Sequence, residues 1–283
     1  MNPDDPKTLV SGDWLESRLD DPSLRVLDGS WYLPASGRDM RAEYEEKHIP
    51  GAVFFDIDEM ADPDSHLPHM VPSPEQFAAK VGKMGISNDH QIVVYDGAGL
   101  FSAARVWWHF RYMGHPEIAV LDGGLPLWIK EGRPLSDSVE TPIRQQMTPQ
   151  IQDHLICDLS DVSEASVNGQ TQIVDARAAE RFQGKVAEPR AGLRSGHIPQ
   201  SLNVPHRTLL EPDGRFKNAQ DITAQFRSCG VDTDKGVIAS CGSGVTGSAI
   251  CLALEIIGHR NHSLYDGSWS EWGGIDDLPV ARA

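Results

Sequence analysis

One short stretch of the chain, residues 240–247, combines a cysteine with glycines and hydroxyl side chains (Ser-Cys-Gly-Ser-Gly-Val-Thr-Gly). The glycines let the backbone curl tightly, so that successive N–H groups can point inward and form an anion-binding nest. A cysteine at the head of such a nest, with the positive end of a helix behind it, is favoured as a thiolate. We therefore expect Cys241 to be a nucleophile. The alternative is a small buried cysteine that merely follows a strand.

The elements around this loop have a recognisable order. Residues Val237–Ser240 form a short apolar run typical of a buried strand, and Ile250, Leu254 and Ile257 follow at helical spacing. Gly258 stands where a glycine is expected to end that helix. Because ligands bind at the carboxyl ends of the strands in open α/β sheets, the loop lies where a ligand site is expected.

The chain repeats itself once, with an offset that stays between 144 and 149 residues. Five segments recur in the same order, which indicates a tandem duplication. The pairs are Val26–Gly29 with Ile173–Ala176, His48–Gly51 with His197–Gln200, Val93–Gly97 with Ile238–Gly242, Gly114–His115 with Gly258–His259, and Leu121–Gly124 with Tyr265–Ser268.

The first half keeps this architecture but lacks the nucleophile. Asp96 stands at the position that matches Cys241, after an apolar run at Ile92–Tyr95 and before a second amphipathic helical pattern. A carboxylate there cannot act as a thiolate, and we interpret Asp96 as a capping or structural acid. Roles that both halves share are more consistent with structure than with catalysis, and the matched histidines His48 and His197 are read as fixing loops through side-chain hydrogen bonds.

Length and element order predict the fold class and the domains. A chain of 283 residues suggests two domains. The alternation of strand, tight loop and helix in both halves predicts α/β domains, each a mostly parallel sheet flanked by helices. We place the domain without the nucleophile at residues 8–130, a polar, proline-containing linker at 131–157, and the catalytic domain at 158–281.

Composition excludes several classes of protein. The net charge of −16 repels phosphate backbones, so no nucleic-acid partner is expected. No apolar run approaches the length of a membrane span, and residues 1–13 do not resemble a secretory signal. The cysteines (Cys157, Cys229, Cys241 and Cys251) lack metal-ligand spacing, so neither a zinc site nor another metal or cofactor is expected. Reduced thiols in the cytoplasm are the default expectation.

The two halves, the Gly-His-Ile-Pro segment at 196–199 and the cysteine loop together resemble the two-domain rhodanese-type sulfurtransferases. The resemblance runs from about Val10 to Pro279. Within this family, a loop of the form C-R-K-G-V-T is typical of enzymes that use thiosulfate. The two basic residues of that loop suit a doubly charged inorganic anion. This chain has neither of them, carries Ser243 and Gly244 in its loop, and is most similar to the 3-mercaptopyruvate sulfurtransferase branch, whose loop is C-G-[ST]-G-V-T.

The resemblance implies a covalent mechanism and its partners. The Cys241 thiolate takes the sulfur of 3-mercaptopyruvate, pyruvate leaves as its enolate, and the cysteine carries a persulfide. An acceptor such as thioredoxin, another thiol or cyanide then removes the outer sulfur. The substrate-binding backbone implied by the loop is that of Gly242, Gly244, Val245 and Thr246.

A keto acid needs a cation in so acidic a chain. The candidates are four arginines upstream of His197, namely Arg177, Arg181, Arg190 and Arg194. By resemblance, Arg181 and Arg190 match the substrate-binding arginines of the family. The alternative for each is a surface arginine paired with Glu180 or Glu188.

The resemblance also suggests an acid–base arrangement of serine, histidine and aspartate. The matching positions are Ser243, His69 and Asp58, with the histidine polarising the serine and the aspartate orienting the histidine. His66 competes with His69 for this role. In the alternative interpretation Ser243 is simply a small loop residue.

Three other functions remain open. A thiosulfate:cyanide sulfurtransferase would share the fold and the nucleophile. A cysteine phosphatase or arsenate reductase would need an arginine six residues after the cysteine, and position 247 is glycine. A non-catalytic module could use the same loop to bind an anionic partner, as the first half does if it is an inactive copy.

Overall fold

The computed structural model describes residues 3–139 and 141–282, which form two compact units. The units are not contiguous in sequence, because each contains a segment from the other half of the chain. Residues 62–70 belong to the second unit, and residues 211–216 belong to the first. Residues 131–152 belong to the first unit, where Gln145 N donates to Gly82 O and Gln150 N donates to Met113 O.

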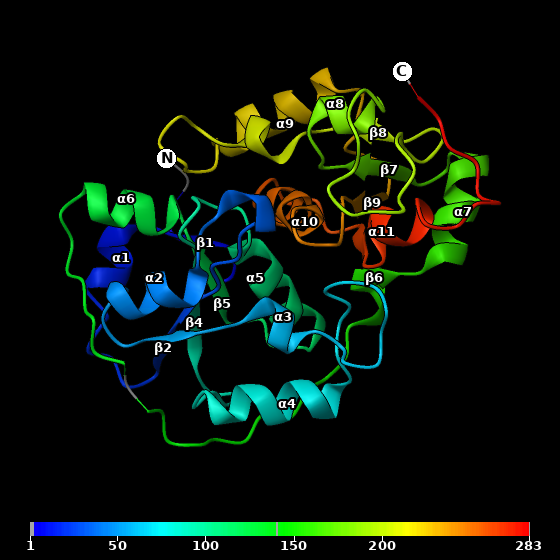
Figure 1. The fold of residues 1–283 in the computed structure, drawn as a ribbon. Coiled ribbons are helices and arrows are strands. Elements are labelled where there is room, and N and C mark those ends of the chain that lie inside the picture. Colours follow the sequence, from blue (N-terminus) through cyan, green and yellow to red (C-terminus); the bar gives the residue numbers. More distant parts are fainter. Residues whose placement is uncertain (1–2, 140, 283) are drawn as a thin grey trace. The chain divides into compact units, whose positions relative to one another are not determined.

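The first unit contains a five-stranded parallel sheet in the order β1-β5-β4-β2-β3 (Figure 1). Its elements in chain order are β1 (Leu9–Val10), α1 (Gly12–Glu16), β2 (Leu24–Asp28), η1 (Pro34–Ser36), α2 (Met40–Glu46), β3 (Ala52–Phe54), α3 (Ile57–Met60), α4 (Pro74–Lys83), β4 (Gln91–Tyr95), α5 (Ala103–Tyr112), β5 (Ile118–Leu121) and α6 (Gly124–Lys130).

Both faces of this sheet are buried, which explains why its strands are apolar without alternation. Val93 and Tyr95 pack on one face in a cluster with Leu15 of α1 and Trp128 of α6. The helix α5 packs against β4 and β5. The second amphipathic helix, which the sequence predicts after Asp96, is confirmed as α5.

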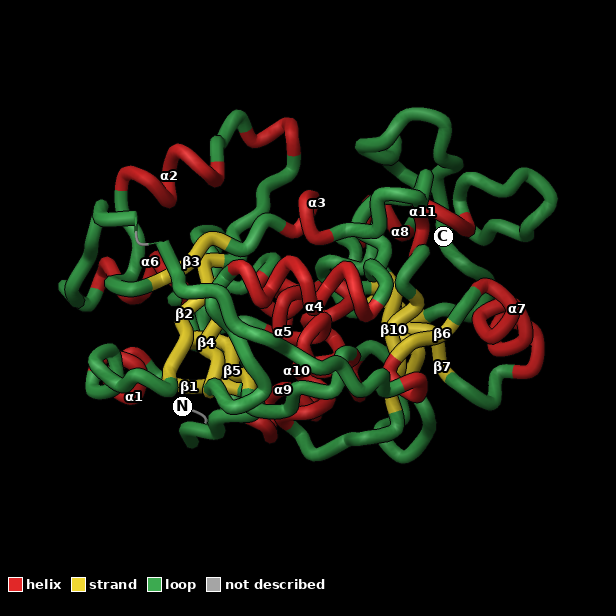
Figure 2. Tube along the Cα trace, turned by 90° about the horizontal axis from the view of Figure 1, so that it is seen from below, coloured by secondary structure: helices red, strands yellow, loops and turns green. Residues whose placement is uncertain are grey.

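The second unit contains another five-stranded parallel sheet, in the order β6-β10-β9-β7-β8 (Figure 2, yellow). Its elements are η2 (Asp153–Leu155), β6 (Ile156–Cys157), α7 (Leu159–Asn168), β7 (Gln172–Asp175), α8 (Ala179–Phe182), β8 (Leu202–Asn203), η3 (His206–Leu209), α9 (Ala219–Ser228), β9 (Val237–Ser240), α10 (Gly247–Ile256), β10 (His262–Tyr265) and α11 (Ser268–Trp272).

Two layers of helix cover this sheet as well. Ile238 and Tyr265 face a cluster that contains Val162 of α7 and Trp269 of α11. The mostly apolar helix α10 packs against β9 and β10. The register places Asp175 of β7 opposite Ser240 of β9, so the residues that follow these two strands arrive at the same edge of the sheet.

The two sheets have the same strand order when β1 to β5 are matched with β6 to β10. The same strand order in both sheets agrees with the duplication inferred from the sequence. The predicted fold class, two α/β domains each built on a parallel sheet flanked by helices, is confirmed. The glycines expected to end the matched helices, Gly114 and Gly258, have φ of 82° and 81° and so lie in the left-handed region.

Candidate functional site

The cysteine loop connects β9 to α10 at the carboxyl edge of the second sheet. Gly244 turns the chain with a φ of +78°, a conformation that favours glycine. Gly242 lies close to Arg181, because a Cβ there would lie 3.1 Å from Nη2 of that residue. Cys241 is almost completely buried, with 1% of its surface exposed, so its sulfur is shielded from bulk water.

The start of α11 binds the carbonyl groups of the loop. Trp269 N donates to the carbonyl oxygen of Cys241 at 3.0 Å. Ser270 donates to the carbonyl oxygen of Gly242 twice, from its N–H at 2.9 Å and from its hydroxyl at 2.7 Å. With these carbonyls engaged by α11, the loop amides are left for other partners.

Most of those amides have no partner in the protein. Within residues 3–139 and 141–282, no group accepts a hydrogen bond from the N–H of Gly242, Ser243, Val245, Thr246 or Gly247. Buried N–H groups are normally satisfied, so such a row of free donors indicates a place where an anion binds. The N-terminal end of the ten-residue helix α10 adds a favourable dipole at the same place.

The matched loop of the first unit has its donors satisfied. The carboxylate of Asp96, which is fully buried, accepts five backbone hydrogen bonds of 2.8 to 3.1 Å. The donors are the N–H groups of Ala98, Leu100, Phe101, Ser102 and Ala103. Asp96 is therefore a structural acid, as predicted, and it shows what this type of loop holds.

The two loops correspond residue by residue. Gly99 and Gly244 each lie three positions after the head residue and have φ of 77° and 78°. Leu125 N donates to the carbonyl oxygen of Asp96 at 3.0 Å, just as Trp269 N does to that of Cys241. The first-unit loop is thus an internal reference with an anion in place.

Arg181, on α8, contacts the loop through its approach to Gly242. It is also paired with Glu188, whose Oε2 lies 2.5 Å from Nη2 and whose Oε1 lies 3.3 Å from Nε. The pairing with Glu188 that the sequence left as an alternative is therefore present, but it does not exclude binding. Within the described parts of the chain nothing accepts from Nη1 of Arg181.

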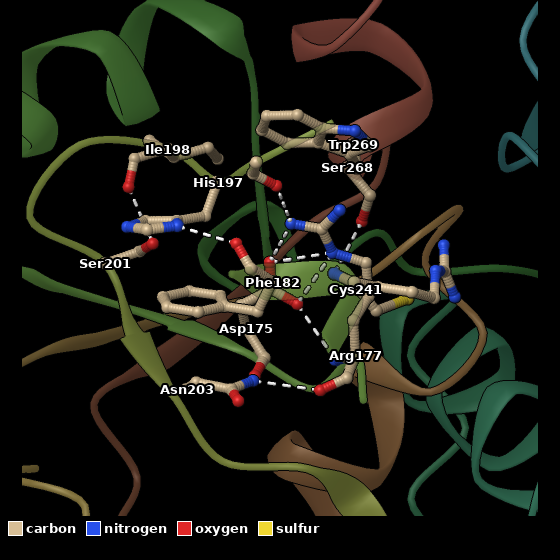
Figure 3. Close-up of polar contacts among 12 residues, drawn as sticks. Asp175, Arg177, Phe182, His197, Ile198, Ser201, Asn203, Cys241, Ser268 and Trp269 are labelled. Atoms are coloured by element: carbon tan, nitrogen blue, oxygen red, sulfur yellow. Dashed lines mark hydrogen bonds and ion pairs between the residues drawn. The ribbon is translucent and has the colours of Figure 1, made fainter. Parts of the chain in front are cut away.

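A second guanidinium, that of Arg177, lies close to Cys241 (Figure 3). It is fully buried, binds Asp175 through Nε and Nη2, and donates to Glu188 Oε1 at 3.0 Å. Its carbon Cζ lies 4.4 Å from the centre of the Trp269 ring. Burial opposes its charge, but the carboxylates of Asp175 and Glu188 together with the charge of an ionised Cys241 raise the pKa of Arg177 above its usual value.

Glu188 thus joins the two arginines. Its carboxylate is 1% exposed and accepts from both guanidinium groups. The sequence offered Glu188 only as a surface partner of Arg181 or Arg190. Arg190 itself is half-buried in the segment between α8 and β8, and its binding role stays a prediction.

His69 belongs to the segment of the first half that joins the second unit. Its Nδ1 lies 2.9 Å from the Oγ of Ser243, so the structure brings together two of the three predicted acid–base residues. His66, the competitor, is exposed. Asp58 lies on α3 of the first unit, where Trp31 Nε1 donates to its Oδ2 at 2.9 Å, and its part in the arrangement stays a prediction.

The structure weakens the phosphatase alternative further. Gly247 is packed so closely that a Cβ there would lie 2.8 Å from Leu264 and 3.3 Å from the carbonyl carbon of Ser240. An arginine at this position would not fit. No group of three or more potential metal ligands was found among the described residues, and their helices are all too short or too polar to cross a bilayer.

The matched histidines have the same contacts in both units. His48 Nδ1 lies 2.7 Å from the carbonyl oxygen of Tyr44, and His197 Nδ1 lies 2.7 Å from that of Phe182. Each ring also stacks on the side chain of the same residue. The predicted structural role of the two histidines is confirmed.

Sequence reasoning missed Ser268, the first residue of α11. Its hydroxyl accepts hydrogen bonds from the N–H of Cys241 and of Gly244. The repeat contains a signal for this residue, because Ser268 is matched with Gly124. The half with the cysteine thus has a serine where the other half has glycine.

Both halves of the chain resemble known proteins of one family. The sequence pattern described as the rhodanese-like domain matches residues 11–131 and 158–274. The chain is 43% identical to the 3-mercaptopyruvate sulfurtransferase of Escherichia coli K12, over 96% of this chain and 97% of that protein. It is 42% identical to the thiosulfate sulfurtransferase of Gallus gallus, over 94% of this chain and 93% of that protein.

A solved structure of similar fold agrees with these matches. SseA from Escherichia coli, a 3-mercaptopyruvate sulfotransferase with the rhodanese fold, superposes with a TM-score of 0.85 at 39% identity. The superposition covers 92% of this chain and 98% of that one.

Proposed function

The chain belongs to the rhodanese-like family, and on that premise we propose that it transfers sulfur from 3-mercaptopyruvate to a thiol or cyanide acceptor. The sulfur is carried between the two half-reactions as a persulfide on Cys241. The observation that carries the proposal is the row of unpartnered loop amides after Cys241, matched in the first unit by amides that bind the Asp96 carboxylate.

The first half-reaction uses these amides to stabilise negative charge on sulfur. The Cys241 thiolate attacks the sulfur of 3-mercaptopyruvate and forms the S–S bond. The C–S bond breaks, and its electron pair becomes the enolate of pyruvate, which a proton converts to pyruvate. The outer sulfur then lies among the amides of Ser243, Val245, Thr246 and Gly247, as an oxyanion lies in its hole.

Two arginines are proposed to bind the keto acid. The Nη1 group of Arg181 faces no described acceptor and is suited to the substrate carboxylate, while Glu188 fixes the rest of this guanidinium. Arg190 is proposed as the second cation. The backbone N–H groups of Gly242, Val245 and Thr246 are proposed to complete the cradle, whereas the N–H of Gly244, also predicted to bind substrate, already donates to Ser268 Oγ.

Ser243 and His69 are proposed to move the proton. The 2.9 Å contact between Nδ1 and Oγ allows the histidine to polarise the hydroxyl, which protonates the departing enolate. Asp58 is proposed to orient His69. No metal or organic cofactor takes part in this scheme.

The second half-reaction regenerates the enzyme. A thiolate acceptor, for which thioredoxin is the proposed protein, attacks the outer sulfur and leaves Cys241 as the thiolate. Cyanide accepts the same sulfur and becomes thiocyanate. We propose a cytoplasmic location, where thiols are kept reduced.

Intact mass spectrometry tests the proposal directly. After mixing with 3-mercaptopyruvate, the purified protein should gain the mass of one sulfur and release one pyruvate. The Cys241→Ser variant should gain none, while Cys229→Ser, which removes a partly exposed cysteine elsewhere, should behave as the wild type. A wild-type protein that gains no sulfur from any donor would favour a non-catalytic module that binds anionic partners.

Thiosulfate is the second candidate donor, because a thiosulfate sulfurtransferase of Gallus gallus is 42% identical to this chain. The loop itself places no lysine or arginine after Cys241, which disfavours a doubly charged inorganic anion. Single-turnover persulfide formation with each donor at equal concentration decides between them. Faster loading from thiosulfate would overturn the choice of 3-mercaptopyruvate and leave the persulfide chemistry intact.

A further inference from the structure

Ser268 has a backbone conformation that residues with a side chain rarely adopt. Its φ is +49°, in the left-handed region, and it is fully buried at the first position of α11. Such a conformation costs free energy for any residue but glycine and persists only where surrounding contacts hold it. Glycine would adopt this conformation at lower cost, so the presence of serine here needs a reason of its own.

The hydroxyl of Ser268 uses its full hydrogen-bonding capacity. It accepts from the N–H of Cys241 at 3.2 Å and from the N–H of Gly244 at 3.1 Å, and it donates to the carbonyl oxygen of Tyr265 at 2.8 Å (Figure 3 shows its position beside Cys241). A serine hydroxyl has one donor and two acceptor positions, so no capacity remains. The side chain thus connects the end of β10 to the nucleophile and to the turn of the loop.

The first unit has a glycine at the matching position. Gly124 has a φ of +59° at the start of α6, where glycine is the residue that this conformation favours. The loop of that unit needs no external hydroxyl, because the carboxylate of Asp96 orders its amides from within. Strain at this position therefore occurs only in the unit that has the nucleophile.

We infer that Ser268 is a positioning residue that holds the cysteine loop in its anion-binding form between turnovers. This inference rests on the proposed function. Ser268 fixes the amides of Cys241 and Gly244, and these two bonds set the direction of the intervening peptides. The amides that match the Asp96 donors then stay in place without a ligand to order them. A loop rich in glycine would otherwise lose this arrangement each time the sulfur departs.

The substitution Ser268→Gly separates this role from a structural one. Glycine relieves the backbone strain but loses the three hydrogen bonds of the hydroxyl, so the two effects offset each other and the unfolding midpoint in urea should change little. The rate of Cys241 alkylation by iodoacetamide at pH 7, resolved by peptide mass spectrometry, should fall about tenfold. A merely structural serine would give the opposite pattern, with altered stability and wild-type alkylation.

Single-turnover kinetics add a second readout. The rate of persulfide formation from 3-mercaptopyruvate at saturation should fall 10- to 100-fold in Ser268→Gly, as expected when preorganised donors are lost. The half-saturating concentration should change less than threefold, because the hydroxyl of Ser268 bonds to Cys241, Gly244 and Tyr265 and not to Arg181, the proposed substrate-binding residue. A large rise in that concentration with an unchanged rate would contradict the inference.

Gln200→Gly is the matched control, because Gln200 is the other non-glycine residue of the catalytic half with positive φ, at +62°, and it is exposed. It should show wild-type alkylation. Ser268→Ala keeps the strain without the hydroxyl and should lose both stability and alkylation rate; if it does not fold, Ser268→Gly still decides. Alkylation needs no sulfur donor, so this test stays valid even if the proposed function is wrong. Wild-type alkylation in Ser268→Gly would overturn this inference and leave the proposed function untouched.

Discussion

The Nδ1 of His69 lies 2.9 Å from the Oγ of Ser243, although 174 positions separate the two residues in sequence. His69 is buried and has a φ of +63°, so its backbone, like that of Ser268, is held in an unfavourable conformation beside the loop. The segment that carries it is closed by a hydrogen bond from Asp62 N to Met70 O. This placement makes the histidine the direct partner of the loop hydroxyl.

Substitution of His69 by asparagine should slow catalysis. Asparagine tolerates positive φ, so the segment should keep its shape while the proton relay is lost. We expect kcat for 3-mercaptopyruvate to fall about 100-fold, with a flatter pH profile of kcat than the wild type has. The exposed His66, changed to alanine, is the control and should leave both unchanged. An unaltered profile in His69→Asn would remove this residue from the mechanism.

Substitution of Arg181 should weaken substrate binding. In Arg181→Lys the forked guanidinium is lost while the charge is kept, and we expect KM for 3-mercaptopyruvate to rise 10- to 100-fold with a smaller change in kcat. Stability should change little, because Arg177 continues to pair with Glu188. Steady-state kinetics and urea denaturation check both statements. Arg207→Lys, at an exposed position, serves as the control, and an unchanged KM in Arg181→Lys would make Arg181 a structural partner of Glu188 only.

Substitution of Asp96 by asparagine should destabilise the protein. One oxygen of the carboxylate would become an NH₂ group that faces amide donors, so buried N–H groups lose their acceptor. We expect the free energy of unfolding to fall by about 3 kcal/mol or more. Asp39→Asn, at the exposed N-cap of α2, should cost at most about 1 kcal/mol. Equal losses in the two variants would mean that the burial of Asp96 adds nothing.

The buried carboxyl of Asp28 should make stability depend on pH. Burial raises the pKa of Asp28 to about 6 from an ordinary value of 3.8. The unfolded chain thus releases this proton at lower pH than the folded protein, so stability falls as the pH rises from 4 through 6, by up to about 3 kcal/mol.

Comparing Asp28→Asn with the wild type isolates this effect. Asparagine keeps an oxygen for the N–H of Ser30, and the variant should be more stable than the wild type at pH 7.5 but nearly equal to it at pH 4. Denaturation in urea at both pH values checks the difference. The exposed Asp20→Asn should show none, and a variant less stable than the wild type at pH 7.5 would contradict the prediction.

Much of the fold could be predicted because its signals are local. The apolar runs before Asp96 and Cys241, the helical spacing after them and the glycines that end both helices each depend on a few neighbouring residues. The repeat then supplied the second copy of every element. The strand at Val237–Ser240 is found as predicted, and the sheet of the first unit follows the same plan.

The site could be predicted only where the chain itself brings residues together. Cys241 and Ser243 share one loop, so their proximity needs no tertiary information. The choice between His66 and His69 depends on which of them contacts the cysteine loop, and spacing does not encode that. The same holds for Glu188, whose two guanidinium partners meet only because β7 and α8 place them on either side of it.

Ser268 shows a further limit of sequence reasoning. Its importance lies in a backbone angle and in two amides of another segment, and serine is common enough to carry no signal alone. Only comparison of the two halves distinguishes it, because glycine is the unstrained choice at the matching Gly124.

The carboxylate of Asp96 has a consequence for how the two copies could diverge after duplication. This carboxylate is covalently part of the chain, so its effective concentration at the loop does not depend on cellular solutes. The first copy therefore keeps its loop conformation without binding or releasing a ligand. The second copy has no carboxylate at this position, and a loop without a permanent occupant is what the proposed transfer of sulfur through Cys241 requires.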